Sequence, residues 1–290
     1  MTDSDTDPVY TVPLDFPIRP EVRFGYHKPM HDGLRKLISA GDGRYSDILE
    51  SFARFAGDFG RIAKEGDDPL EPYWRNDWIP SLDAMSLYGL MVTTNPRVYA
   101  EIGSGTSTKF VRRAIRDHGL NTKIISVDPY PRSEIDQICD EVVRSPLESA
   151  DLALFKALAP GDILFCDNSH RCFQNSDVTV FFLDILPHLH PGVIVGLHDI
   201  FLPFDYPPNW LKRYYNEQYL LACWLLASST VQIELPVFFC GTEARFSMPI
   251  ASLFTAPELM EIPRHGGCFW FRNTSWSTSP NTGILRALGR

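Results

Sequence analysis

Apolar residues in the first third of the chain recur at helical spacing. Between Tyr45 and Ile62 they stand three and four positions apart, at Ile48, Phe52, Phe55 and Phe59. A similar pattern at Leu82, Met85, Tyr88 and Met91 predicts a helix over Ser81–Thr94. Asn95-Pro96 should end this helix, because the residue before a proline avoids helical backbone angles. We expect a helical cap over residues 21–95, preceded by a surface arm at residues 1–20.

From Arg97 onward the period of the pattern changes. Short apolar runs indicate buried strands at Val98–Ile102, Ile124–Val127, Ile163–Cys166 and Val193–Leu197. Amphipathic segments between them predict helices at Lys109–Asp117, Leu147–Leu158 and Asp177–Leu186. This β-α-β alternation is typical of an α/β fold with a mostly parallel, doubly wound sheet. We expect the α/β domain to occupy residues 96–273 and a surface tail to occupy residues 274–290.

The region after this alternation contains aromatic and proline residues. Phe201–Pro208 is predicted to be a stiff loop that leads into a helix over Trp210–Leu226. The loop is a candidate for a pocket wall, although simple packing explains it equally well. Val231–Phe239 and Cys268–Phe271 are predicted to be two antiparallel strands, separated by an insertion. Three N-terminal residues are candidates for a lid over a site: Tyr26, His27 and His31.

Charge and composition narrow the range of partners. The 290 residues include 27 Lys+Arg and 36 Asp+Glu, and the resulting net charge of −9 argues against a nucleic-acid partner. No stretch approaches the roughly 20 apolar residues that span a bilayer, and the first residues do not resemble a signal peptide. The six cysteines are scattered, so we expect neither a zinc ribbon nor a disulfide framework. We expect a soluble, cytoplasmic protein that acts on a small molecule without a membrane partner; a homo-oligomer stays open.

A glycine-containing turn follows the first strand of the predicted sheet. Gly103-Ser104-Gly105 stands directly before a helix. The glycines allow the backbone to approach a ligand closely, and the free N–H groups at a helix start favour an anionic group. A dinucleotide fingerprint would need a third glycine where Thr108 stands, which weakens the case for nicotinamide or flavin. A plain strand-to-helix turn is the alternative.

The second strand ends at Asp128. A carboxylate only accepts hydrogen bonds, so it suits a ribose diol, which offers two donors side by side. Asp128 follows the glycine turn by one β-α-β step, which fits this role. The alternative is an N-cap or solvated loop aspartate.

Together these residues resemble the class I S-adenosylmethionine-dependent methyltransferases. The resemblance rests on Glu101-x-Gly-x-Gly, Asp128, the strand over residues 162–167 and Leu189-His190-Pro191-Gly192, and it covers roughly Trp78 to Leu226. It is closest to the small-molecule O-methyltransferases whose fourth strand ends in Asp-x-x-His and whose fifth ends in His-Asp.

The resemblance implies a set of residues for binding S-adenosylmethionine. Gly103, Ser104 and Gly105 would lie against its methionine portion, with Glu101 near the amino group and Asp167 close by. Asp128 would bind the ribose hydroxyls. Ser145 to Leu147 would flank the adenine, although Arg144-Ser145-Pro146 departs from the acidic or amide residue common at that place.

Two strand ends bring two carboxylates and two imidazoles to the same rim. The fourth strand leads into Asp167 and His170, and the fifth leads into His198 and Asp199. An imidazole can take a proton from a hydroxyl nucleophile. Alternatively, Asp167 and Asp199 can hold Mg²⁺ or another divalent cation that lowers the pKa of that hydroxyl. We predict catalytic roles for His198, His170 and Asp199, with His198 favoured as the proton acceptor.

Two features of the rim leave its chemistry open. Catechol-type methyltransferases hold magnesium with Asp and Asp-Asn ligands, and Asp167 with Asn168 or Asp199 matches that set in part. A purely structural hydrogen bond is the alternative for either histidine taken alone. Metal dependence therefore stays open.

We expect an enzyme that transfers a methyl group from S-adenosylmethionine to a small polar acceptor, at oxygen. The sulfonium methyl is already electrophilic, so the protein has to align the acceptor and remove its proton. Two alternatives stay open, since fold alone does not fix function. One is a metal-dependent hydroxylase or hydrolase on the same fold, and the other is a non-catalytic cofactor-binding protein.

Overall fold

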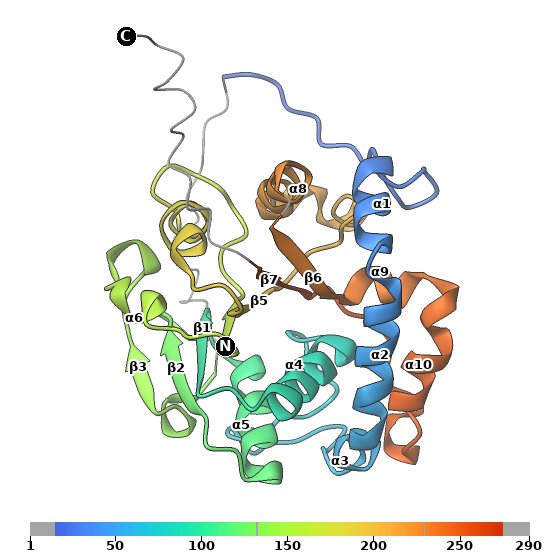
Figure 1. Ribbon diagram of the computed structural model, residues 1–290, viewed down its shortest axis with the longest axis vertical. Helices are drawn as coiled ribbons and strands as arrows, with labels where there is room; N and C mark the ends of the chain where they lie inside the picture. Colours follow the sequence, from blue (N-terminus) through green and yellow to red (C-terminus); the bar gives the residue numbers. More distant parts are fainter. Residues whose placement is uncertain (1–14, 132, 229, 275–290) are drawn as a thin grey trace, which may run out of the picture.

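The chain forms a seven-stranded sheet in the computed structural model, which describes residues 15–131, 133–228 and 230–274. The strands lie in the order β3-β2-β1-β4-β5-β7-β6 (Figure 1). Their bounds are β1 Val98–Ile102, β2 Lys123–Val127, β3 Glu141–Val143, β4 Ile163–Cys166, β5 Ile194–Leu197, β6 Val231–Pro236 and β7 Phe269–Asn273. Strands β1 to β5 pair in parallel, and β7 runs antiparallel to β5 and β6. This confirms the α/β, mostly parallel, doubly wound fold predicted from the sequence.

The predicted strands match the observed ones closely. β1 and β4 have the predicted bounds, while β2 begins one residue earlier and β5 one residue later. Every residue of β1, β4 and β5 is buried, because helices cover both faces of a parallel sheet. The strand order reverses between β1 and β4, and ligands bind at such a point beyond the carboxyl ends of the strands.

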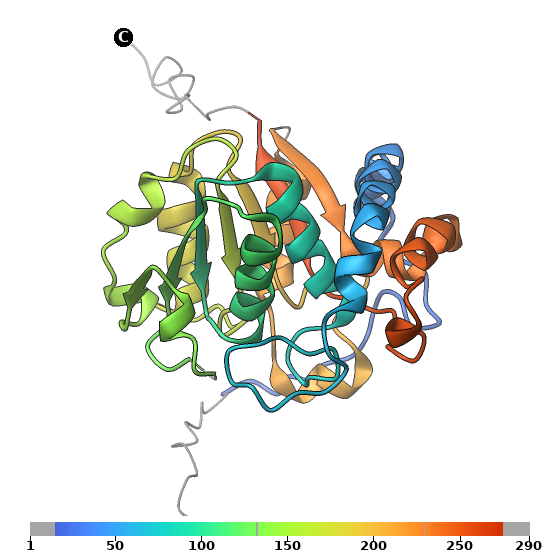
Figure 2. The same ribbon diagram turned by 90° about the horizontal axis from the view of Figure 1, so that it is seen from below.

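Helices lie on both sides of the sheet (Figures 1 and 2). α4 (Ser81–Thr94) and α5 (Thr106–His118) pack against each other on one side, and α8 (Glu217–Ala227) lies on the other side of β6 and β7. α1 (Asp32–Ser39) contacts α8, and α2 (Asp42–Phe52) contacts β6 and α10 (Ser247–Leu253). The shorter helices are α3 Ala56–Gly60, α6 Ala153–Lys156, α7 Asp177–Val180 and α9 Val237–Thr242.

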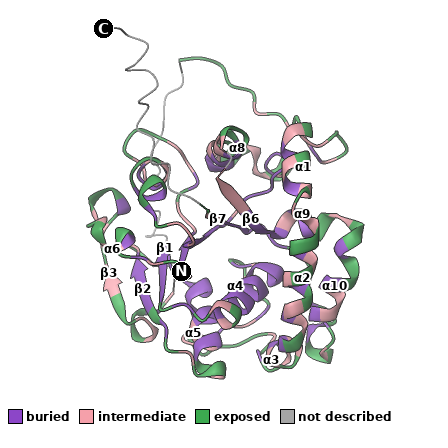
Figure 3. Cartoon of the chain, in the orientation of Figure 1, coloured by how far each residue is buried: buried purple, intermediate pink, exposed green. Residues whose placement is uncertain are grey.

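Helix α4 has the predicted bounds and is buried on all sides. Every residue from Ser81 to Met91 is buried, as Figure 3 shows. Polar groups inside it are satisfied by the sheet, since Ser86 Oγ accepts a hydrogen bond from Trp270 Nε1 at 2.8 Å. The helix ends at Asn95, which has a left-handed conformation with φ 46° and precedes Pro96.

Three predicted helices are broken in the structure. The segment predicted as a helix at Tyr45–Ile62 is divided into α2, a 3-10 turn at Ala53–Phe55 and α3. Leu147–Leu158 forms only a 3-10 turn at Leu147–Ser149 and the single turn α6. Asp177–Leu186 begins as α7 but continues as a wider π-helix over Phe181–Ile185 and a 3-10 turn at Leu186–His188. Short apolar spacing does not separate these helix types, because all of them bury one side.

Two further predictions after β5 are wrong in detail. The predicted helix Trp210–Leu226 is interrupted: a 3-10 helix covers Pro208–Arg213, Tyr214 is left-handed with φ 54°, and α8 begins at Glu217. The predicted strand Val231–Phe239 ends at Pro236, where the chain turns into α9. The predicted insertion contains α10 between short 3-10 turns at Ala244–Phe246 and Pro257–Leu259.

The two predicted surface arms fall largely outside the described residues. Of the arm at residues 1–20 only 15–20 are described, and of the tail at residues 274–290 only Thr274. The division into a cap at residues 21–95 and a domain at residues 96–273 stays a prediction. None of the helices within residues 15–274 that the structure describes has the length and apolar character that crossing a membrane requires.

Candidate active site

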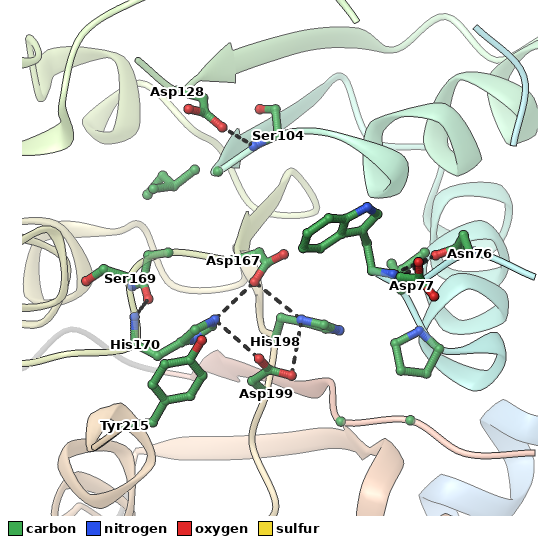
Figure 4. Close-up of a pocket in the computed structure, with 18 of the residues that line it drawn as sticks. Asn76, Asp77, Ser104, Asp128, Asp167, Ser169, His170, His198, Asp199 and Tyr215 are labelled. Atoms are coloured by element: carbon green, nitrogen blue, oxygen red, sulfur yellow. Dashed lines mark hydrogen bonds and ion pairs between the residues drawn. The ribbon is translucent and has the colours of Figure 1, made fainter. Parts of the chain in front are cut away.

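A cavity of about 1220 Å³ opens at the carboxyl edge of the parallel strands. Its walls include the glycine turn after β1, Asp128 after β2, Asp167 after β4 and His198 after β5. Figure 4 shows Ser104 and Asp128 near one end of the view and the rim residues Asp167, His170, His198 and Asp199 gathered at its centre. The sheet thus brings the predicted cofactor-binding and catalytic residues to one cavity, apart from Glu101 and Ser145, discussed below, and Gly105, which lines a smaller hollow shared with Ser104 and Asp167.

The glycine turn packs directly against the end of β4. Gly103 has φ +77°, and a Cβ there would lie 1.9 Å from the carbonyl oxygen of Asp167. A side chain is therefore excluded, and β1 and β4 can approach each other at the switch point. At Gly105 the nearest atom to a Cβ would be Ser133 Oγ at 4.0 Å, so this side of the turn is open.

Glu101 lies behind the turn and does not line the cavity. It is fully buried, and its carboxylate accepts hydrogen bonds from the hydroxyls of Tyr99, at 2.9 Å, and Thr108. The Thr108 hydroxyl accepts a hydrogen bond from the Gly105 N–H at 3.1 Å. Burial raises the pKa of Glu101 to about 7, although the hydroxyl donors oppose this shift. Glu101 therefore fixes the shape of the turn from below.

Asp128 lies at the cavity surface with both carboxylate oxygens held. One accepts the Ser104 N–H at 2.7 Å, and the other accepts the Tyr130 N–H at 2.8 Å. Each carboxylate oxygen has a further lone pair for a ligand hydroxyl. Ser145, in contrast, does not line the cavity and its hydroxyl donates to the carbonyl of Pro146, which does.

The residues after β4 form a tight, polar connection. His170 is left-handed with φ 57°, and its backbone N–H donates to Asn168 Oδ1 at 2.8 Å. Its Nε2 lies 3.2 Å from Asp167 Oδ1 and 3.4 Å from Asp199 Oδ2, while Nδ1 lies 2.9 Å from Glu217 Oε2. Asn168 Nδ2 also donates to Glu217, at 2.8 Å. His170 is thus enclosed by three carboxylates.

The imidazole of His198 lies between carboxylates from three elements. Its Nδ1 lies 3.3 Å from Asp167 Oδ1 and 3.5 Å from Asp199 Oδ1. Its Nε2 lies 3.3 Å from Asp83 Oδ2, an ion-pair contact without good hydrogen-bond geometry. Asp83 in α4 is fully buried and also accepts the N–H groups of Gly267 and Cys268, each at 2.7 Å.

These contacts determine which rim residues carry charge. Burial alone would lower the pKa of both imidazoles, but the surrounding carboxylates outweigh it and raise the pKa of His170 and His198 well above the usual value. Burial is likewise outweighed at Asp167, whose pKa the two imidazoles hold well below its usual value. Burial raises the pKa of Asp199 and of Glu217. These directions favour the imidazolium form of both histidines.

Neither Asp83 nor Glu217 is among the site residues predicted from the sequence. The structure buries Glu217 completely against His170. A signal was present in the sequence at Asp83, because it interrupts the apolar run Leu82–Met85 of a helix that is apolar on all sides. A carboxylate in such a place needs a buried partner.

The predicted lid residues do not line the cavity, whereas two residues of the aromatic segment do. Tyr26, His27 and His31 are absent from the cavity wall, and Tyr26 packs edge-on against Phe204 with ring centroids 5.3 Å apart. From the aromatic segment, Phe201 and Trp210 line the cavity. Of the predicted loop Phe201–Pro208, only Phe201 contributes to the cavity wall, so most of the loop packs elsewhere.

The rim residues also fit a divalent cation. Asp167, His170 and Asp199 each offer one ligand atom, and these atoms all lie within 4.8 Å of one another. Carboxylate oxygens suit Mg²⁺, and an added imidazole suits Mn²⁺ and its neighbours in the first transition series. A second group, Asp83, His198 and Cys268, is similarly close but wholly buried.

Residues 100–200 match the sequence model of a family described as a methyltransferase domain. The matched segment begins in β1 and ends just after β5, so it contains the glycine turn, Asp128 and the rim residues. This match over part of the chain confirms the resemblance noted in the sequence. No curated protein matches the sequence.

Several solved structures resemble the chain at low sequence identity. An SAH-bound methyltransferase from Podospora anserina is 16% identical, with 87% of this chain and 100% of that chain covered and a TM-score of 0.42. The O-methyltransferase TomG from Streptomyces achromogenes, in complex with SAM, is 14% identical, with 77% and 96% covered and a TM-score of 0.41. An O-methyltransferase from Bacillus cereus, in complex with SAH, is 16% identical, with 72% and 84% covered and a TM-score of 0.35. At such identities the family match is the comparison that bears on function.

Proposed function

We propose that this chain, whose residues 100–200 match a family described as a methyltransferase domain, transfers a methyl group from S-adenosylmethionine to a hydroxyl oxygen of a small molecule. The observation that carries the proposal is one cavity that joins the glycine turn and Asp128 to a cluster of ionised groups. The glycine turn and Asp128 suit a nucleoside that carries an amino-acid moiety. The cluster of ionised groups suits the removal of a proton.

The cavity wall after β1 and β2 would hold the cofactor. The open side of Gly105 leaves room for its methionine portion, and the remaining lone pairs of Asp128 would accept the ribose hydroxyls. Glu101 is already bonded to two hydroxyls, so we assign it to supporting the turn and not to the cofactor's amino group. Ser145 lies off the cavity, and Pro146 and Leu147 would face the adenine.

The rim residues would align the acceptor and remove its proton. S-adenosylmethionine supplies an electrophilic methyl group on its sulfonium, so a deprotonated oxygen in line with it is sufficient for transfer. His198 was the favoured proton acceptor in the sequence, but an imidazolium has no free lone pair. We assign the proton to Asp199, whose raised pKa makes it a stronger base than an ordinary carboxylate. His198 and His170 would position Asp167 and Asp199.

A divalent cation would bind at Asp167 and Asp199, with His170 as a third ligand. When bound, it would lower the pKa of the acceptor hydroxyl and offset the negative charge that keeps the imidazoles protonated. His198 would then be the neutral base predicted from the sequence. Mg²⁺ and Mn²⁺ both fit these donors.

The wider context of the enzyme follows from the same features. We propose a cytoplasmic enzyme that acts on a small molecule, without nucleic acid or membrane as partner, and the net charge of −9 supports this. A metal-dependent hydroxylase or hydrolase is the second candidate, because Asp167, His170 and Asp199 could serve such chemistry.

Two measurements test the proposal. Calorimetry with S-adenosylhomocysteine and with NAD should show binding of the former only. Metabolite pools incubated with the protein and methyl-labelled S-adenosylmethionine should yield labelled O-methyl products in mass spectrometry. Tighter binding of NAD would overturn the cofactor, and metal-dependent turnover without label would favour the second candidate.

A further inference from the structure

Two arginines line the cavity beside the rim residues. Arg171 directly follows His170, and Arg213 is the last residue of the 3-10 helix Pro208–Arg213. The Arg171 Nε donates to the carbonyl oxygen of Arg213 at 2.9 Å, so the two segments are joined at this place. The guanidinium groups therefore belong to one built corner of the cavity.

Aromatic rings support both guanidinium groups. The Arg213 guanidinium lies 4.0 Å from the ring centre of Trp210 and 5.5 Å from that of Tyr215. The Arg171 guanidinium lies 4.9 Å from the centre of the same Tyr215 ring. Stacking holds a guanidinium in place while leaving its edge N–H groups free to donate.

Neither guanidinium has an acidic partner among the residues that the structure describes. Several arginines elsewhere in the chain pair with carboxylates, as Arg113 does with Asp117 at 2.9 Å and Arg272 with Glu234 at 2.6 Å. Arg171 and Arg213 thus place two cations without such partners in one corner of a cavity, in a chain that has more acidic than basic residues. Their free N–H groups match an anion on a ligand.

The position of this corner relates it to the methyl acceptor. The Tyr215 ring lies 4.7 Å from the imidazole of His170, with which it shares one side of the cavity in Figure 4. The Tyr215 ring and the His170 imidazole thus lie between Arg213 and the two carboxylates Asp167 and Asp199. Asp128 and the glycine turn follow other strands of the sheet, so binding of the cofactor does not involve the cavity corner at Arg171 and Arg213.

We propose that the methyl acceptor is a hydroxylated aromatic acid, whose carboxylate binds Arg213 and Arg171 while its hydroxyl faces Asp199. Trp210, Tyr215 and Phe201 provide the aromatic wall for its ring. Bidentate guanidinium contacts would fix the carboxylate, and the length of the acid would set which hydroxyl reaches Asp199. The identity of the acid as acceptor rests on the proposed methyl transfer, whereas the anion site itself does not.

Binding of matched acids and amides tests the proposal. Protein in excess S-adenosylhomocysteine is titrated calorimetrically with para-hydroxybenzoate, para-hydroxyphenylacetate and para-hydroxyphenylpropionate, each compared with its carboxamide. At least one acid should bind about 10-fold or more tightly than its amide, since a charge-assisted contact is lost in the amide. If every amide binds as tightly as its acid, or no acid binds, the proposal is wrong.

Substitutions of Arg213 and Arg171 test whether these two residues cause the preference for an acid over its amide. Arg213→Gln and Arg171→Gln should each reduce the preference for the acid by about 10-fold, with S-adenosylhomocysteine affinity unchanged. Arg54→Gln is the matched control, because Arg54 also stacks on a ring, that of Phe55 at 4.7 Å, but lies outside the cavity. A preference that survives both cavity variants would overturn the proposal, and so would a loss of cofactor affinity without a change in preference.

The same experiments separate this inference from the proposed function. If acids are preferred through Arg213 but no label is ever transferred, methyl transfer is wrong and the anion site stands. If label is transferred equally well to an acid and its amide, and Arg213→Gln changes neither rate, methyl transfer stands and the anion site is wrong.

Discussion

At the scale of single residues, the two halves of the cavity are held in different ways. Asp128 is positioned by two backbone N–H groups, which come from the turns themselves. Asp167 is positioned by two imidazoles, which need carboxylates of their own at Asp83 and Glu217. A substitution at Asp128 should therefore act locally, whereas a substitution at Asp167 should disturb the whole cluster of imidazoles and carboxylates around it.

Asp128→Ala should weaken S-adenosylmethionine binding by about 2–3 kcal/mol, the scale of losing charge-assisted hydrogen bonds. Calorimetry measures this in protein whose circular dichroism is unchanged. Asp151→Ala is a control, because Asp151 also accepts a backbone N–H, at 2.9 Å, but lies outside the cavity. An unchanged affinity in folded Asp128→Ala protein would remove Asp128 from the site.

Asp199→Asn should lower kcat by about 10²–10⁴-fold, because an amide cannot accept the proton of the acceptor hydroxyl. His198→Ala should lower kcat on the same scale, through the position of Asp199 or as the base itself, with cofactor affinity nearly intact. Rates are measured with the native acceptor, with and without chelator.

The outcomes distinguish three sources of catalysis: a bound cation, Asp199 as the base, and the imidazoles. A loss of activity with chelator that Mg²⁺ restores would assign the rim to a cation held by Asp167 and Asp199. Full activity in Asp199→Asn would exclude Asp199 as the base. Full activity in both His198→Ala and His170→Ala would leave the imidazoles without a role in turnover.

Glu101 should make the stability of the protein depend on pH. Its pKa is about 7 in the folded chain against 4.5 for the unperturbed group, so the folded state holds the proton longer. Stability contributed by Glu101 is therefore present below pH 4.5 and is lost as pH rises to about 7, by roughly 3 kcal/mol. Glu101→Gln should not show this loss.

Urea unfolding of both proteins at several pH values between about 4.5 and 8 isolates this effect, because other groups titrate equally in each. The difference in unfolding free energy between variant and natural protein should shift in favour of the variant as pH rises. A difference that stays constant would mean that Glu101 keeps its ordinary pKa.

At the scale of elements, the sequence predicted buried strands better than helices. β1 and β4 were predicted to the residue, because a parallel strand buried on both faces is an apolar run with sharp ends. The breaks within Leu147–Leu158 and at Tyr214 were missed, because apolar spacing does not show where a helix changes to a 3-10 turn. Helix α4 was found with its correct end because Asn95-Pro96 marks it.

Gly89→Ala in α4 should destabilise the fold, although alanine is the better helix former. A Cβ at Gly89 would lie 2.5 Å from the ring of Phe52 in α2, and overpacking of this kind costs about 1–3 kcal/mol. Gly43→Ala in α2 is the matched control, since nothing lies within 4 Å of its Cβ position. The control should stabilise by about 0.4–1 kcal/mol.

Urea unfolding gives both values. Equal effects of the two substitutions would show that α2 and α4 move apart easily, and that the close contact of Gly89 with Phe52 is not held firmly.

At the scale of the whole molecule, the site depends on segments far apart in the sequence. The ends of β4 and β5 could be predicted to meet, because carboxyl ends of neighbouring parallel strands share one edge. Asp83 and Glu217 could not be placed there, since they come from α4 and α8, whose docking follows from tertiary packing and not from local pattern. The same packing encloses two imidazoles among four carboxylates, which raise the pKa of both imidazoles.

Because this cluster joins α4, α8 and two strands of the sheet, a cation bound within it should stabilise the entire fold. Binding to the folded chain alone adds about 2.7 kcal/mol at a concentration 100-fold above Kd, which for a chain of this size raises Tm by about 5 °C. Thermal melts with Mg²⁺ or Mn²⁺ after chelator treatment should show this rise, and Asp199→Asn should abolish it. Asp184→Asn is the control, because Asp184 is exposed and lies outside the cavity. An equal Tm with and without both cations would remove the metal from the site and leave proton transfer to the protein's own groups.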